Sequence, residues 1–442
     1  MKFLLSFSSR AIQGTQLRFG MFAAVIFLLS PLAAMAAEDP TERIRELEKK
    51  LLKSLEMIEQ LQTRVRTIET TAKPSVPATV AAPADASRIT QLEQSVAQIA
   101  ANSSNISSGL TGIPLYGFMD VGYGQRSDRA RKGFRLGSLD LYLTPNFGNG
   151  FRGLVELIFE IGENGELITD LERLQVGYDF SDALTLWGGR FHTPYGYWNT
   201  AFHHGVQIQT SILRPRFLAF EDNGGILPAH SVGLWATGKV DSSGNKLVYN
   251  AYIANAQTIE LQTGPGSGVL SPNMAGSSRG PATVGGSVGV RFTGGLNGLE
   301  IGAHGLTSSI DDTDIIPNRT RLGMFGGYFV YDENDWEIIG ETYQFRNRNA
   351  GRAFHSNASF LQIGREFGLI TVFGRAENGS FNQADPYFAQ QENGRSYSRF
   401  STGLKYNLTP SAALKFELLR HKSKDPSLES YSEGLAQFAV RF

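Results

Sequence analysis

The chain of 442 residues contains no cysteine, which excludes disulfides, thiolate metal sites, cysteine nucleophiles and a lipid anchor on an N-terminal cysteine. Its formal net charge is only −1, and bulk nucleic-acid binding requires a basic surface. Beyond residue 36 it lacks any run of about 20 apolar residues, so no transmembrane helix is predicted there. Such a chain can span a membrane only as a closed barrel, because lipid offers backbone groups no hydrogen-bond partner.

Glycine and aromatic residues are abundant instead. The chain has 49 glycines, 29 phenylalanines and 15 tyrosines, although only 41% of its residues are hydrophobic. Aromatic residues favour strands and glycine favours turns. The composition therefore indicates many strands joined by turns.

The first 36 residues have the three parts of a secretory signal peptide. Basic residues precede an apolar run over 21–32, and Ala-Met-Ala at 34–36 gives the small-x-small cleavage pattern. The alternative is a membrane anchor, but the apolar run is short for a membrane span. We therefore expect residues 1–36 to be a signal peptide and the protein to be exported.

The segment that follows is predicted to be helical. Between Ile44 and Ile68, apolar residues recur at alternating steps of three and four, with Ser54 as the one gap. This seam predicts a coiled coil over residues 37–72, with an isolated amphipathic helix as the alternative. A Pro- and Ala-rich linker is expected over 73–86 and a short second helix over 87–108.

From Leu115 onward the hydrophobic period changes to two. One strand is predicted at 150–160 and the last at 432–442, each with an apolar and a more polar face. In the last strand the apolar face is formed by Ala436, Phe438, Val440 and Phe442. Such strands are typical of a membrane barrel, although a soluble β-sandwich also alternates.

The connections distinguish these two folds. Sixteen strands are predicted, near residues 114–124, 134–145, 150–161, 171–180, 183–192, 230–240, 246–256, 282–293, 298–307, 319–331, 335–346, 354–366, 369–377, 396–408, 411–421 and 432–442. Connections after even-numbered strands are short, whereas the largest after odd-numbered strands are 193–229, 257–281 and 378–395. Short turns on one rim and long loops on the other are typical of outer-membrane barrels. The predicted fold is all-β: an antiparallel transmembrane β-barrel of about sixteen strands over 112–442, preceded by an α-helical coiled coil in the periplasm.

Several short motifs resemble those of general Gram-negative outer-membrane porins. They are LYGFMDVG at 115–122, Glu160, ERLQVGY at 172–178, GGRFHTP at 188–194 and the terminal Phe442. The resemblance covers roughly 115–195 and the C-terminus, and the coiled coil departs from it; phosphate-selective porins are a related possibility. It implies a sixteen-stranded, trimeric, water-filled channel in which the third long loop folds inward.

The third long loop is 193–229, and it carries charged residues that we predict at the constriction. The loop contributes Arg214, Arg216, Glu221 and Asp222, and the barrel wall contributes Arg152, Arg173 and Arg190. Arg190, within GGRFHTP, is the foremost candidate for the pore wall. Basic residues facing acids across a pore select ions and orient polar solutes. The alternative is that these charges only solvate a wet lumen.

Four histidines, His192, His203, His204 and His230, lie in or beside this loop. Adjacent side chains such as His203 and His204 rarely share one metal ion, and no HxxxH or HExxH motif is present. The sequence therefore predicts no metal site and no cofactor. Aromatic residues near strand ends, among them Trp187 and Trp336, are predicted to form girdles at the membrane interfaces.

The sequence predicts passive diffusion of small hydrophilic solutes or ions across the outer membrane, and no enzymatic activity. Two GxSxG strings occur, at 276–280 and 285–289, but neither is predicted on a strand-to-helix turn that exposes a nucleophile. The alternative is a structural protein whose stalk joins the membrane to peptidoglycan. The expected partners are outer-membrane lipid, small solutes or ions and two further copies of the chain, and not nucleic acid. The solute and the sign of selectivity stay open.

Overall fold

The computed structural model describes residues 115–128, 132–162, 165–202, 205–262, 266–276, 280–312 and 319–442. The predicted signal peptide, coiled coil, linker and second helix lie outside these residues, as do His203 and His204. Among the described residues, no helix is long and apolar enough to cross a membrane.

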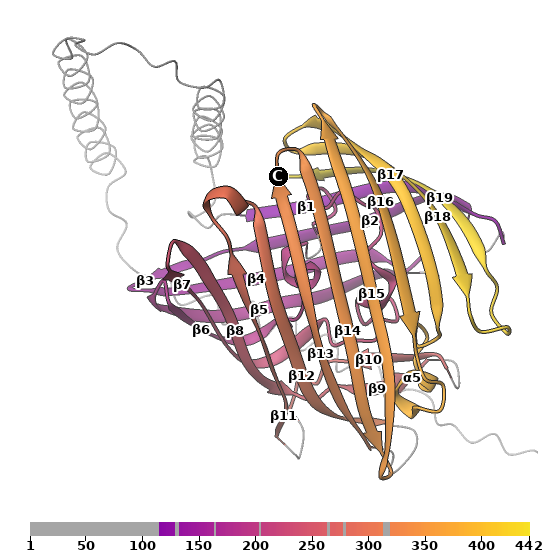
Figure 1. The fold of residues 1–442 in the computed structure, drawn as a ribbon, viewed down its shortest axis with the longest axis horizontal. Coiled ribbons are helices and arrows are strands. Elements are labelled where there is room, and N and C mark those ends of the chain that lie inside the picture. Colours follow the sequence, from indigo (N-terminus) through magenta and orange to yellow (C-terminus); the bar gives the residue numbers. More distant parts are fainter. Residues whose placement is uncertain are drawn as a thin grey trace, which may run out of the picture. The chain divides into compact units, whose positions relative to one another are not determined.

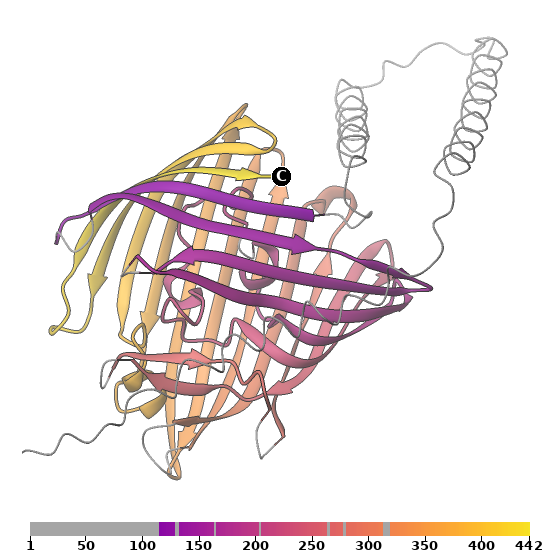
Figure 2. The ribbon, with the colours of Figure 1, turned by 180° about the vertical axis from the view of Figure 1, so that it is seen from behind.

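The described chain forms a closed antiparallel β-barrel with sixteen long strands (Figures 1 and 2). The long strands are β1 (Leu115–Arg126), β2 (Lys132–Leu143), β4 (Phe151–Ile161), β5 (Leu167–Ser181), β6 (Leu184–His192), β7 (His230–Ser242), β8 (Asn245–Asn255), β11 (Pro281–Arg291), β12 (Leu299–Asp312), β13 (Arg319–Glu333), β14 (Trp336–Asn349), β15 (Arg352–Phe367), β16 (Ile370–Ser380), β17 (Tyr397–Thr409), β18 (Ala412–Ser423) and β19 (Tyr431–Arg441). The short elements are β3 (Asn146–Gly148), β9 (Thr258–Leu261), β10 (Gly268–Ser271), α4 (Trp198–Ala201), α5 (Pro386–Gln390) and the 3-10 turns η2 (Arg216–Leu218) and η3 (Gly294–Leu296). Each predicted strand is present, so the predicted barrel is confirmed.

The first and last strands close the barrel. β1 pairs antiparallel with β2 on one side and with β19 on the other. At the seam, the backbone N–H groups of Gly117 and Phe442 each donate to the other residue's carbonyl at 3.0 Å. Closure leaves no unpaired sheet edge. A sheet can span lipid only in this way, because lipid offers no hydrogen-bond partner to unpaired backbone groups.

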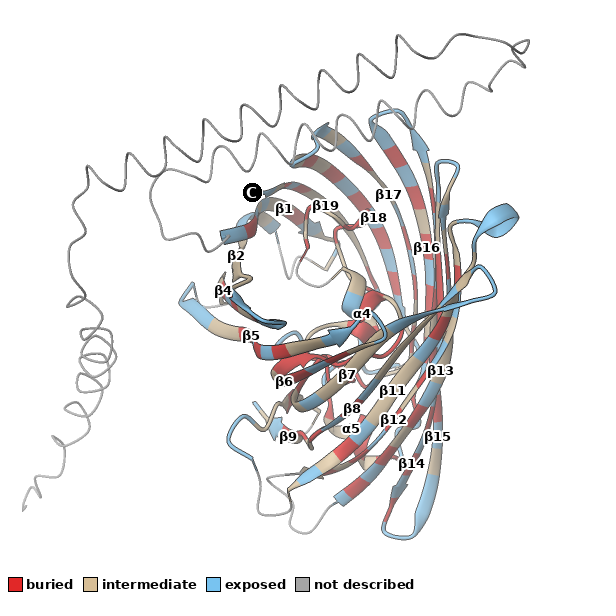
Figure 3. Ribbon diagram, turned by 90° about the vertical axis from the view of Figure 1, so that its left-hand side faces the viewer, coloured by how far each residue is buried: buried red, intermediate tan, exposed pale blue. Residues whose placement is uncertain are grey.

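The two faces of the wall differ in polarity because successive side chains of a strand point to opposite sides. In β18, Phe416 and Leu418 are exposed on the outside, whereas Lys415 and Glu417 are fully buried inside. The alternation of buried and exposed positions runs along the strands of the wall (Figure 3). The outer surface is therefore an apolar belt suited to hydrocarbon, and the inside carries the charges.

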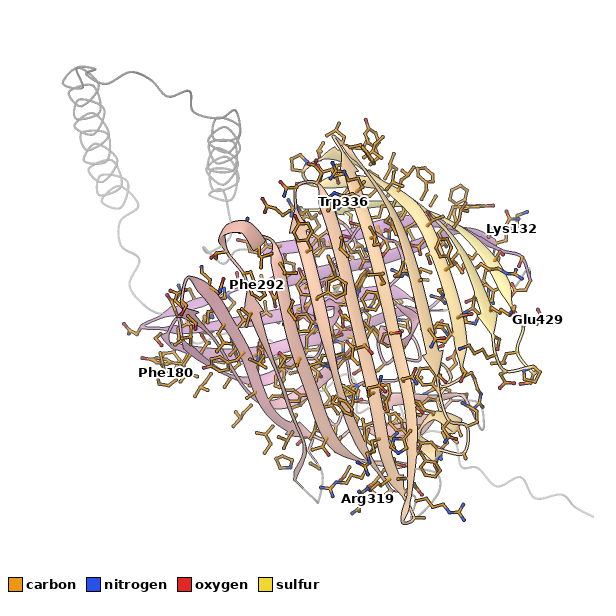
Figure 4. All side chains as sticks on the ribbon, viewed as in Figure 1. Lys132, Phe180, Phe292, Arg319, Trp336 and Glu429 are labelled. Atoms are coloured by element: carbon orange, nitrogen blue, oxygen red, sulfur yellow. The ribbon has the colours of Figure 1, made fainter. Side chains whose placement is uncertain are left out.

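Aromatic residues gather at the short-turn rim, as predicted for Trp336. Phe180, Phe292 and Trp336 lie at this rim, whereas Lys132, Arg319 and Glu429 lie at the long-loop rim (Figure 4). The prediction is wrong for Trp187, which points into the barrel, is 9% exposed and stacks on Trp235 with ring centroids 6.3 Å apart. Successive side chains of a strand point to opposite faces, and the preceding residue Leu186 faces the lipid, so Trp187 faces the interior.

Gly117 at the seam has no room for a side chain. A Cβ there would lie 2.4 Å from Cζ of the Phe442 ring and 2.7 Å from the carbonyl oxygen of Asp140. We expect Gly117→Val to destabilise the closed barrel by about 1–3 kcal/mol, the usual cost of overpacking. The measurement is the folded fraction after refolding into detergent, read from heat-modifiable gel mobility. Gly374→Val is the matched control, because its Cβ would meet nothing within 4 Å; equal folded fractions for the two variants would contradict the prediction.

Candidate functional site

The loop 193–229 leaves the wall between β6 and β7 and folds into the barrel. Its helix α4 lies inside the ring of strands (Figure 3). The loop reaches the far wall, where it contacts strands from β14 to β18. This position agrees with what the porin resemblance implies for the third long loop.

Three glutamates of the far wall, Glu341, Glu377 and Glu417, accept backbone N–H groups of the loop. The donors are Tyr197 and Trp198 to Glu341 at 3.2 and 2.7 Å, Arg216 to Glu377 at 2.8 Å, and Ile212 and Leu213 to Glu417 at 2.8 and 3.1 Å. Hydrogen bonds to an ionised acceptor are roughly twice as strong as neutral ones. These contacts hold the loop backbone against the wall.

Basic residues of the same wall hold carbonyl groups of the loop. Arg375 Nη1 donates to the carbonyl of Leu213 at 2.9 Å, and Lys405 Nζ donates to that of Ile208 at 3.1 Å. Lys415 Nζ donates to the carbonyl of Ser211 at 3.2 Å. These three cations are buried under the loop, so they position it rather than face the solvent.

Aromatic packing completes the attachment of the loop. Trp198 and Phe217 are fully buried, and they contact the wall residues Phe360 and Tyr343 at centroid distances of 5.5 and 5.2 Å. Burying a large apolar side chain contributes roughly 1.5–3 kcal/mol. The loop therefore fills one side of the barrel as a packed layer.

A polar cavity of about 840 Å³ remains between the loop and the short-turn rim. Tyr197 and Thr200 of the loop contribute to its lining. Its charged lining residues are Arg152, Asp179, Asp182, Lys239, Asp241, Lys246, Arg291 and Glu300. Two ion pairs cross this surface, Arg152 to Asp179 at 2.8 Å and Arg291 to Glu300 at 2.5 Å. The charges of this cavity are balanced, so it favours neither sign of ion.

On the long-loop side, Arg126, Arg216 and Arg399 gather around Tyr397 and Tyr431, and we call these five residues the arginine–tyrosine cluster. The guanidinium carbon of Arg126 lies 3.8 Å from the centroid of the Tyr431 ring, and that of Arg216 lies 5.7 Å from that of Tyr397. Arg399 Nη2 donates to the Tyr431 hydroxyl at 3.4 Å. The five residues of the cluster come from β1, the loop 193–229, β17 and β19.

This cluster has an excess of positive charge. Arg126 pairs with Asp128 at 2.5 Å, but in the described part of the chain neither Arg216 nor Arg399 forms an ion pair. Burial, together with the neighbouring Arg399 guanidinium, lowers the pKa of Arg216. The two guanidinium groups repel each other, and the Glu377 carboxylate, which accepts the Tyr397 hydroxyl at 3.2 Å, offsets part of their charge.

The wall residues predicted from sequence take three different environments. Arg152 lines the polar cavity, and Arg173 is paired with the buried Glu156 at 2.5 Å. Arg190 is 6% exposed and lies between two carboxylates, with Asp170 at 3.1 Å and Glu172 at 3.5 Å. Their role as pore wall stays a prediction.

The loop residues predicted from sequence also separate. Arg216 joins the arginine–tyrosine cluster, whereas Arg214 packs over the Phe220 ring at 3.9 Å, where burial lowers its pKa to about 10. Asp222 is exposed and accepts the N–H of its neighbour Asn223. Glu221 is buried and faces His230; burial favours its neutral form, but His230 outweighs this and lowers the pKa of Glu221.

The sequence reasoning missed the wall residues that hold the loop. They are Glu341, Arg375, Glu377, Lys405, Lys415 and Glu417, together with Arg126 and Arg399 of the cluster. A signal was present, because each occupies an inward position in a strand of period two. The pattern indicates that they point inward, but it does not indicate which of them the loop covers.

Comparisons with known proteins bear on the fold. No protein-family model matches the chain, and no curated protein matches its sequence. Among solved structures, the anion-selective porin from Comamonas acidovorans is similar, with a TM-score of 0.51 and 16% identity over 75% of this chain and 99% of that one. OmpT of Vibrio cholerae with its loop L8 deleted gives a TM-score of 0.50 and 10% identity, again over 75% of this chain and 99% of that one. At these identities the likeness shows a shared fold, the barrel of outer-membrane porins.

Proposed function

We propose that the protein is an outer-membrane porin through which small hydrophilic solutes and ions diffuse passively. The observation that carries this is the loop 193–229, folded into a closed barrel that is apolar outside and charged inside. A loop of this length that is packed and held by charged groups has a function in the lumen. A polar cavity of about 840 Å³ on its short-turn side provides an aqueous space.

We further propose that the channel prefers anions. The support is the arginine–tyrosine cluster, in which Arg216 and Arg399 lie near each other without ion pairs in the described residues. Rings of basic side chains favour anions in pores. The Comamonas porin of similar fold is named as anion-selective. We also propose that the protein is a homotrimer, which the porin-like motifs favour. In this proposal a periplasmic coiled coil over 37–72 assists trimer formation.

Planar-bilayer recording of the purified protein tests both statements. We expect stepwise conductance and, in a salt gradient, a reversal potential whose sign shows faster passage of chloride than of potassium. Protein that is folded by gel mobility but gives no conductance would remove the porin proposal. Conductance with preference for potassium would remove only the anion preference.

A further inference from the structure

Two histidines face each other where the loop 193–229 begins and ends. His192 is the last residue of β6 and His230 the first of β7, and the two are cross-strand partners. Directly opposed residues of an antiparallel pair have Cβ atoms about 4.5–5.5 Å apart, close enough for their side chains to meet. Glu172 reaches the same point from β5, next to a register shift between β4 and β5.

The donor atoms of these three side chains converge. His230 Nε2 lies 3.1 Å from His192 Nε2 and 2.6 Å from Glu172 Oε2. One ligand atom from each residue lies within 4.8 Å of the other two. All three side chains are buried: Glu172 is 6%, His192 5% and His230 2% exposed. In the parts of the chain that the structure describes, they form the one such set of possible metal ligands.

Hydrogen bonds on the far side of each imidazole fix its orientation. His192 Nδ1 lies 3.0 Å from the carbonyl oxygen of Asn199, and His230 Nδ1 lies 2.9 Å from Glu221 Oε2. Both partners are acceptors, so each Nδ1 carries the proton, and in the neutral ring the lone pair is on Nε2. Metal-ligating histidines are held in this way by a carbonyl or a carboxylate.

The supporting groups are themselves fixed by the root of the loop. The Asn199 side-chain amide donates to the carbonyls of Thr193 and Ala229 at 3.0 and 3.1 Å. Glu221 also accepts the backbone N–H of His230 at 2.8 Å. The Phe220 ring stacks on His230 at a centroid distance of 5.7 Å and shields the pair from water. The supporting groups are therefore held in place around two buried imidazoles.

A metal ion suits the three converging atoms. A proton on His230 Nε2 is shared between Glu172 Oε2 at 2.6 Å and His192 Nε2 at 3.1 Å, whereas a metal ion would bind these two atoms and His230 Nε2 directly. Around a tetrahedral zinc ion, with bonds of about 2.0–2.2 Å, ligand atoms are roughly 3.3 Å apart. The observed distances of 3.1 and 2.6 Å would widen by about 0.2 and 0.7 Å on binding.

The local charge also suits a dication. Arg190 lies between Asp170 at 3.1 Å and Glu172 at 3.5 Å, so the carboxylates of Asp170, Glu172 and Glu221 carry two more negative charges than this one guanidinium balances. With both imidazoles neutral, one divalent ion balances these two negative charges. Two imidazoles and a carboxylate are a ligand set that zinc accepts, with a fourth position left for water.

We propose that His192, His230 and Glu172 bind one zinc ion, which ties together the two ends of the loop 193–229. Glu221 and Asn199 orient the two imidazoles. The ion is structural: it fixes the root of the loop where the chain enters and leaves the barrel. This proposal does not depend on the channel function, because its tests measure metal binding.

The first test is metal binding by the full-length, untagged protein in detergent after treatment with a chelator. Titration with Zn²⁺ by calorimetry should give one ion per chain with micromolar affinity or tighter. Co²⁺ in place of Zn²⁺ should give the visible absorption bands of a tetrahedral site with nitrogen and oxygen ligands. No binding of Zn²⁺, or no tetrahedral Co²⁺ spectrum, overturns the proposal and leaves a protonated His230 bridging Glu172 and Glu221.

Variants then assign the ligands. His192→Ala and His230→Ala should abolish Zn²⁺ binding, and Glu221→Gln should weaken it about 10- to 100-fold, as is usual for a group that orients a ligand. His355→Ala, which removes an exposed histidine on β15, should bind as the wild type does. Gel mobility confirms that each variant is folded.

Two variant results would overturn the assignment. One is wild-type Zn²⁺ affinity in His192→Ala and His230→Ala. The other is loss of binding in the His355→Ala variant, which would place the ion elsewhere. If neither ligand variant folds, the Co²⁺ spectrum of the wild type decides. A wild-type spectrum without tetrahedral bands then ends the proposal.

Discussion

Replacing Glu377 and Glu417 together by alanine is expected to release the loop from the far wall and raise single-channel conductance. The two carboxylates accept three backbone N–H groups of the loop, and both contact Arg375, at 3.0 and 3.5 Å. Removing them leaves the guanidinium of Arg375 buried without a carboxylate, a situation that costs about 3–5 kcal/mol. Movement of the loop away from this wall lets water reach Arg375 and relieves the cost.

The measurement is bilayer conductance, together with protease cleavage within 193–229. We expect the mean conductance to rise roughly twofold, with added current noise, and the loop to be cut faster, because a narrow segment limits flow through a pore. Glu366→Ala is the matched control, because this glutamate is exposed at the end of β15 and forms no hydrogen bond or ion pair with the described residues of the loop. Unchanged conductance and unchanged cleavage in the double variant would show that the loop does not depend on these carboxylates.

Replacing Arg216 by glutamate is expected to shift the channel from anion toward cation preference. Arg216 and Arg399 repel each other at present, and a carboxylate at position 216 would instead pair with Arg399. The exchange removes one positive charge, adds a negative one and neutralises a second guanidinium. Because charge near a narrow point governs which ions pass, the chloride-to-potassium permeability ratio should fall several-fold.

Reversal potentials in a salt gradient measure this shift. Arg420→Glu makes the same change of charge on the exposed outer face of β18, and should leave the ratio as it is. Arg190→Ala belongs in the same series, because the sequence singles out Arg190 while the structure shows it buried between Asp170 and Glu172. If the chloride-to-potassium permeability ratio changes in Arg190→Ala and not in Arg216→Glu, the residue that selects ions is Arg190 of the motif GGRFHTP.

The barrel could be predicted from the sequence because the wall is constrained on both sides. Lipid outside and water inside impose a period of two on every strand, and this period is visible in runs such as Phe438, Val440 and Phe442. The two rims were also predictable, because short and long connections alternate along the chain as they do in outer-membrane barrels. The two inner histidines could have been paired from the ends of β6 and β7 alone.

The loop could not be predicted in the same way. Its backbone has no regular period, and its position depends on contacts with residues such as Glu341 and Glu417 on distant strands. Glu172 illustrates a second limit: it joins the histidines beside a register shift, which changes the face that a residue occupies. Neither the position of the loop nor the register shift at Glu172 can be recognised from the spacing of residues along one strand.

The attachment of the loop also has a consequence for the order of assembly. Ile212 and Glu417 are 205 positions apart along the chain, and Lys415 holds the carbonyl of Ser211 across a similar interval. Contacts of such long separation form late, because the intervening chain must first be in place. The anchoring strand β18 is the last but one to be synthesised. The passage therefore takes its final width only when the barrel is almost complete, and a chain that stops short of β18 has nothing to hold its loop at this point of the wall.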